Sequence, residues 1–113
     1  MAQDLLAERI ARRQLASKTR AERLRQAVPA VARRLREKGA TRVILFGSLA
    51  SGAQTHEGTD IDLCVEGVSL IDAERTSLDL AESVGAVDLV RWETAPEELR
   101  AVVERYGVLI EDE

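Results

Sequence analysis

The sequence predicts an α/β domain, a short mixed sheet with helices on one side, preceded by an N-terminal helical arm. Short apolar runs at 42–46, 60–66 and 86–91 are typical of buried strands, and segments of helical periodicity separate them. Residues 4–27 contain good helix formers and neither glycine nor proline, which predicts a helix ahead of the first strand.

The N-terminal region allows two descriptions. A second helix can begin near Val28, because proline at position 29 suits a first helical turn; Pro29 can equally kink one long helix. In either case Gly39 ends the helix. One apolar face is expected on Leu24, Val28, Val31 and Leu35. This assigns residues 1–27 to a basic helical extension and residues 28–113 to the main domain.

The remaining elements follow in alternation. The strand at 42–46 ends at Gly47-Ser48, and the polar residues 53–59 predict a loop before the strand at 60–66. A helix is expected over 70–84, a strand over 86–91, a helix from Pro96 to Gly107 and a short last strand over 108–110. The inward positions of the first of these helices are expected to be Ile71, Leu78, Ala81 and Val84.

Composition limits the classes of function. The 113 residues are 45% hydrophobic and 32% charged, and no run reaches the ~18 apolar residues of a membrane span, so we expect a cytoplasmic domain without a membrane partner. The single cysteine, Cys64, excludes an internal disulfide and is expected in the core. The single histidine, His56, is expected to be solvated in the 53–59 loop, and Cys/His metal clusters are excluded.

Charge is divided unevenly along the chain. Residues 1–40 contain 11 basic and 4 acidic residues, whereas residues 41–113 contain 5 and 16. The basic arm can bind an acidic partner, lie on an acidic surface of its own chain or build a homo-oligomer or hetero-oligomer. A sequence pI near 5.1 and 3% aromatic residues argue against an autonomous nucleic-acid binder.

Three carboxylates fall on predicted strands. Asp60 and Asp62 are two residues apart and are expected on one face, and Asp88 interrupts an apolar strand. Burying such charges without partners costs several kcal/mol, so something must neutralise them. Oxygen ligands without nearby His or Cys suit Mg²⁺ or Mn²⁺.

The Gly47-Ser48 turn offers the complementary chemistry. A glycine at a strand end lets the backbone approach a ligand closely, and the following N–H groups and hydroxyl suit a phosphate. A helix N-cap is the alternative role for Ser48. Trp92, just after the third strand, is expected to pack at the sheet edge rather than to stack on a base.

The order of these motifs resembles the nucleotidyltransferase fold of the DNA polymerase β superfamily. The matching segments are Leu45-Phe46-Gly47-Ser48-Leu49-Ala50-Ser51-Gly52, Thr59-Asp60-Ile61-Asp62-Leu63 and Val87-Asp88-Leu89-Val90. The chain is most similar to minimal nucleotidyltransferases, the antitoxins encoded beside HEPN-domain toxins. The resemblance covers residues 28–110 and leaves the basic arm outside.

The resemblance implies an enzyme that transfers AMP from ATP to a hydroxyl and releases pyrophosphate. It implies that Asp60, Asp62 and Asp88 hold two Mg²⁺ ions, that Asp88 also helps to activate the attacking hydroxyl, and that Gly47 and Ser48 clamp the terminal phosphates. Relatives that modify small molecules carry an additional acceptor domain. The expected acceptor is therefore a tyrosine of a partner HEPN-type toxin.

Two other functions remain open. Family members often have Arg where this chain has Leu49 and Ser51, and Ser at the position of Thr59. Since Arg gives bidentate phosphate contacts, its loss favours a catalytically weak binding module that neutralises its partner by contact. The chain can also be a subunit that modifies a small molecule together with a separate acceptor-binding chain.

Overall fold

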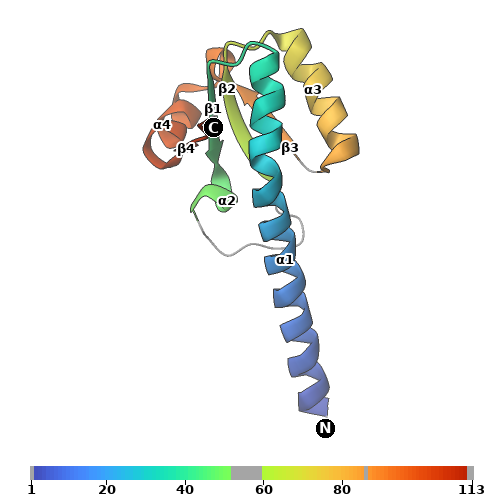
Figure 1. The fold of residues 1–113 in the computed structure, drawn as a ribbon. Coiled ribbons are helices and arrows are strands. Elements are labelled where there is room, and N and C mark those ends of the chain that lie inside the picture. Colours follow the sequence, from blue (N-terminus) through green and yellow to red (C-terminus); the bar gives the residue numbers. More distant parts are fainter. Residues whose placement is uncertain (1, 52–59, 86, 112–113) are drawn as a thin grey trace.

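The computed structural model describes residues 2–51, 60–85 and 87–111 (Figure 1). A single helix, α1 (Ala2–Glu37), precedes strand β1 (Arg42–Phe46), the short helix α2 (Gly47–Ser51) and strand β2 (Ile61–Glu66). Helix α3 (Leu70–Ser83), strand β3 (Val87–Arg91), the 3-10 turn η1 (Trp92–Thr94), helix α4 (Glu97–Tyr106) and strand β4 (Val108–Leu109) follow. The predicted α/β class is confirmed.

The N-terminal alternatives resolve to one continuous helix. Pro29 lies inside α1, on its exposed side. Leu24, Val28, Val31 and Leu35 are buried on one face, as their spacing predicts. Gly39 follows the helix with a φ of 104°, a left-handed conformation that favours glycine. None of the described helices is long and apolar enough to cross a membrane.

The four strands form one mixed sheet in the order β3-β2-β1-β4. Strand β1 is antiparallel to β2 and β4, and β2 is parallel to β3, with α3 as the connection between the parallel strands. Arg36 of α1 donates a hydrogen bond to the carbonyl of Ile110, and the Ile110 N–H bonds the carbonyl of Val43, so the end of the chain is held against the sheet.

Helices cover both faces of the sheet, and the expectation of helices on one side is therefore wrong. Helices α1 and α3 pack on the face that carries Val43, Leu45, Ile61, Leu63 and Val65. On the other face, Ile44 and Cys64 pack against Val103 of α4, which confirms Cys64 as a core residue. Because β1 is buried on both faces, its run is continuously apolar rather than alternating, and this pattern was the signal in the sequence for a second covered face.

Helix α3 turns a different face to the core than predicted. Ala73, Thr76 and Leu80 are its buried residues, whereas Ile71 and Leu78 are 61% and 70% exposed. Positions two residues apart on a helix lie about 200° apart, so the stripes through 71–78 and 73–80 are on opposite sides. The small Ala73 and Thr76 let α3 pack closely on the sheet beside Leu80, and Ile71 and Leu78 remain outside.

Candidate active site at the carboxylate edge of the sheet

Two of the three predicted acids are direct neighbours in the sheet. Asp62 of β2 and Asp88 of β3 are register partners in the parallel pair, so their side chains project from the same face. Cys64 lies on the same face, two residues further along β2, where α4 covers the sheet. Asp62 is half-buried and Asp88 is exposed. The topology therefore brings together two carboxylates that are 26 residues apart in the sequence.

Asp60 joins this pair electrostatically. It lies immediately before β2, not inside the strand as predicted, and it is exposed. The pKa of Asp62 is raised above its ordinary value, first by burial and then by the negative charges of Asp88 and Asp60. Among the residues that the structure describes, the ion pairs are Arg34–Asp79 and Arg42–Glu66, and neither includes one of these three carboxylates.

Gly47 lies directly against this acidic group. It connects β1 to α2 with a φ of 75°, a conformation that favours glycine. A Cβ at this position would collide with Oδ2 of Asp62 and would lie 3.1 Å from its Cγ. Both the backbone and the space therefore require glycine here. Ser48 follows on α2 and is half-buried.

The donor chemistry fits a hard divalent cation. Carboxylate oxygens are the ligands Mg²⁺ prefers, and a bound cation would offset both the burial and the neighbouring negative charges that raise the pKa of Asp62. Among the residues described, no group of three ligating side chains is gathered closely enough to hold an ion. Asp62 and Asp88 are thus placed side by side with Asp60 within electrostatic reach, without a closed three-ligand cage.

The residues that depart from the family pattern have separate fates. Leu49 is buried in the core under α1, so that position serves packing here. The Ser51 side chain, His56 and Thr59 lie outside the described residues, as does the predicted 53–59 loop.

Trp92 is an edge-packing residue, as predicted. Its ring packs against the cluster of Ile44, Cys64 and Val103, and the guanidinium groups of Arg42 and Arg100 lie over it, 4.8 and 4.9 Å from the ring centre. Arg100 also donates a hydrogen bond to the Trp92 carbonyl. The ring is therefore already engaged by the core and by two cations of the chain itself.

Sequence reasoning missed a groove beside α3. The groove has a volume of about 580 Å³ and is lined by nine residues of α3, β3 and η1. These residues are Leu70, Ala73, Glu74, Ser77, Leu78, Leu89, Val90, Arg91 and Thr94. The groove is a feature separate from the Asp62–Gly47 contact. Exposed Ile71 and Leu78 on a helix with a clear second apolar stripe were the available signal.

Comparison with known proteins identifies the fold. Residues 25–106 match the model of the nucleotidyltransferase domain family. A solved structure described as a proposed minimal nucleotidyltransferase is 34% identical, with a TM-score of 0.67 over 78% of this chain and 93% of that one. The sequence has no significant match among curated proteins.

Structures of toxin–antitoxin complexes are also similar. One, solved with AMP-PNP, is 27% identical, with a TM-score of 0.63 over 74% of this chain and 71% of that one. Another, a tri-AMPylated Shewanella oneidensis HEPN toxin in complex with its MNT antitoxin, shares the fold at 22% identity, with a TM-score of 0.56 over 74% and 68% of the chains. With its sheet order, its paired aspartates and a family match over most of its length, the chain belongs to the nucleotidyltransferase domain family and is related to the minimal nucleotidyltransferases.

Proposed function

We propose that this nucleotidyltransferase transfers AMP from ATP to a hydroxyl of a HEPN-type toxin, in a Mg²⁺-dependent reaction, and so acts as its antitoxin. The observation that carries the proposal is the pairing of Asp62 with Asp88 in register, beside a glycine that leaves room for nothing larger. This combination places negative ligands and an accessible backbone at one edge of the sheet.

The roles proposed for the side chains follow from their positions. Asp60, Asp62 and Asp88 would hold the Mg²⁺ ions. When bound, such ions neutralise charge on the entering and leaving oxygens of an in-line phosphoryl displacement. The absence of a side chain at Gly47, with the Ser48 hydroxyl beside it, would let the β- and γ-phosphates approach the backbone. Asp88, the more exposed of the register pair, would face the attacking hydroxyl and accept its proton.

The acceptor is proposed to be a tyrosine on a partner protein. The related complex crystallised with AMP-PNP pairs an antitoxin with a toxin, and in the S. oneidensis complex the HEPN toxin bound to the MNT antitoxin is tri-AMPylated. Asp60 and Asp88 are exposed, so a hydroxyl carried by another protein could reach them from solvent.

The division of labour within the chain is also proposed. Residues 28–113 would form the catalytic domain and residues 1–27 an extension. Helix α1 runs through this boundary without interruption, its buried side chains begin at Ala21 and the family match begins at residue 25.

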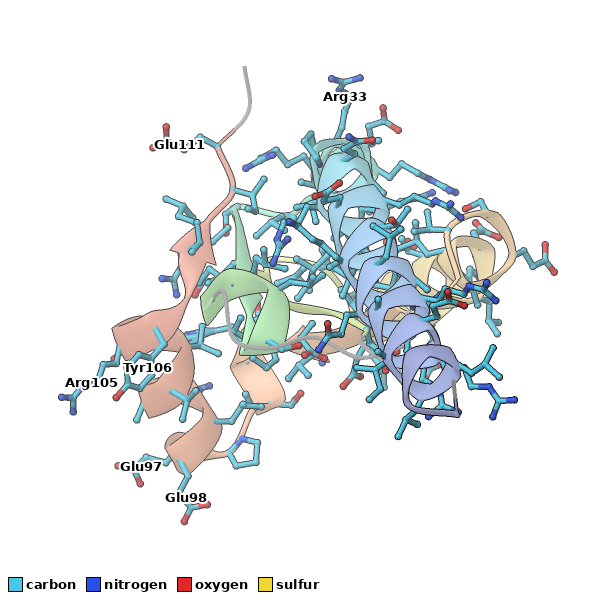
Figure 2. The ribbon with its side chains drawn as sticks, turned by 90° about the horizontal axis from the view of Figure 1, so that it is seen from below. Arg33, Glu97, Glu98, Arg105, Tyr106 and Glu111 are labelled. Carbon is cyan, nitrogen blue, oxygen red and sulfur yellow. The ribbon has the colours of Figure 1, made fainter. Side chains whose placement is uncertain are left out.

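Label transfer from α-³²P ATP tests the proposal. The chain is mixed with Mg²⁺ and a lysate of the source cells that contains its partner, and Asp88→Asn is compared with Glu98→Gln, an exposed acid on α4 (Figure 2). We expect one labelled protein band with wild type and Glu98→Gln, and none with Asp88→Asn. Label in small molecules instead would support the small-molecule subunit.

A contact-only antitoxin is the second candidate. It is favoured by the lack of a three-ligand group among the described residues and by buried Leu49 where relatives often have Arg. Co-expression with the toxin separates the two: Asp62→Asn abolishes protection if transfer is required and preserves it if contact suffices.

A further inference from the structure

The N-terminal arm, defined as residues 5–19 of α1, extends beyond the rest of the molecule (Figure 1). The molecule measures 57 × 29 × 25 Å. All described side chains of the arm are exposed, and its four large apolar residues, Leu5, Leu6, Ile10 and Leu15, are 48–65% exposed. A lone helix of this length is marginally stable in water, so an unpacked apolar stripe indicates a surface that is covered on assembly.

A matching surface exists elsewhere on the same chain. The α3–β3 groove, defined above, is lined mainly by apolar residues that include Leu70, Leu78 and Leu89. It runs beside β3, which is an edge strand of the sheet. An amphipathic helix commonly binds in such a groove through apolar residues one turn apart.

Charge makes the two surfaces complementary. Within the arm, four basic residues (Arg9, Arg12, Arg13 and Lys18) stand against one acid, Glu8. Helix α3 contains four acids and one basic residue, so its net charge is opposite to that of the arm; on the groove itself, Glu74 and Arg91 balance each other. The other exposed apolar patch, Val102, Tyr106, Val108 and Leu109 on α4 and β4, is a poorer match because α4 carries three acids and two basic residues.

The arm cannot reach the groove of its own chain. The C-terminal half of α1 is fixed beside α3, where Arg34 and Asp79 form an ion pair at 3.3 Å. From there α1 continues without a break toward its N-terminus, so the arm extends about 22 Å away from α3. We propose that the arm of one copy binds the α3–β3 groove of a second copy, and that reciprocal exchange closes a twofold dimer. The inference does not depend on the proposed transfer reaction.

Sedimentation of the full chain tests this arrangement. We expect wild type to sediment at twice the 12.4 kDa chain mass at about 50 μM, with weaker association as salt screens the charged rims. Ile10→Glu in the arm and Leu78→Glu in the groove should each raise the dissociation constant at least about tenfold. Val102→Glu on α4 changes an apolar residue about as exposed as Ile10 by the same charge and should leave the mass unchanged.

A mixing experiment distinguishes arm-to-groove exchange from pairing between arms. The Ile10→Glu chain retains its groove and the Leu78→Glu chain retains its arm, so an equimolar mixture should regain heterodimer. A Leu78→Glu chain that still dimerises fully would show that arms pair with one another and would overturn the proposal. A monomeric wild type would overturn it too and assign the arm to a different macromolecule, and open polymers would contradict the closed exchange.

Discussion

Replacing Gly47 by alanine tests the geometry of the candidate site more directly than removing an acid does. The new methyl group meets two costs. One is the φ of 75°, which disfavours any L side chain by about 1–2 kcal/mol. The other is the collision with the Asp62 carboxylate, whose Cγ would lie 3.1 Å from the new Cβ. Displacing a packed group typically costs a further ~1–3 kcal/mol.

Gly85 supplies the matched control. Its φ of 107° carries the backbone cost, but nothing lies within 4 Å of a Cβ built there. Urea unfolding should therefore give a midpoint about 1 M lower for Gly47→Ala than for Gly85→Ala, for an m-value of about 2 kcal/mol/M. Label transfer should fall with Gly47→Ala only, since the displaced carboxylate no longer holds its position.

A double variant isolates the contact. With Asp62→Ala the carboxylate is gone, so adding Gly47→Ala should cost little more than Gly85→Ala does. Equal urea midpoints for Gly47→Ala and Gly85→Ala in the wild-type background, with transfer intact in both, would refute the placement of Gly47 against Asp62.

Three further predictions concern the core, the arm and the acid pair. Leu80→Ala should destabilise the chain by about 2–5 kcal/mol, whereas Leu78→Ala, measured on dilute protein, should change the urea midpoint little; the opposite order would contradict the orientation of α3. Leu15→Ala should likewise leave the thermal midpoint of dilute protein unchanged, because the side chain contacts no core; a large drop would mean the arm packs on its own domain. Folding raises the pKa of Asp62, so the protonated carboxyl stabilises the folded chain. This contribution is fully present below the pKa that Asp62 has in the unfolded chain and is lost as the pH rises through its pKa in the folded chain. In EDTA, Asp62→Asn should therefore be more stable than wild type at pH 7, with the difference vanishing near pH 3 in calorimetry; a less stable variant at pH 7 would contradict the like-charge environment.

Much of the fold follows from local patterns, and the errors have identifiable causes. Strand β1 coincides with the predicted run 42–46, and Pro96 and Gly107 flank α4 as expected. The predicted orientation of α3 is wrong because two opposite faces of this helix are apolar, and which of them is buried depends on the sheet that the helix packs against. The continuous apolar run at 42–46 is typical of a strand buried on both faces, but it does not show which helix covers the second face, and that helix is α4.

The sequence predicts which acids belong to the candidate site, but not how they are arranged in space. The order of motifs along the chain points to Asp60, Asp62 and Asp88, but the roles of these residues rest on the resemblance and stay predictions. Their pairing requires β2 and β3 to be parallel neighbours in a register that joins positions 62 and 88, and that depends on how α3 crosses the sheet. The contact between Gly47 and Asp62 likewise requires β1 and β2 to pair antiparallel, with Phe46 opposite Asp62.

The exposure of the three acids follows a gradient that bears on how an acceptor arrives. Asp62 is half-buried between Gly47 and Asp88, whereas Asp60 and Asp88 are exposed. Under the proposed function, Asp60 and Asp88 are therefore the acids that a hydroxyl of a partner protein could reach from solvent. The groove beside α3 is lined by residues other than these acids. A tyrosine carried on the rigid surface of a partner would gain its orientation from that partner, so a variant of the partner surface alone should reduce transfer to the toxin while leaving nucleotide binding unchanged.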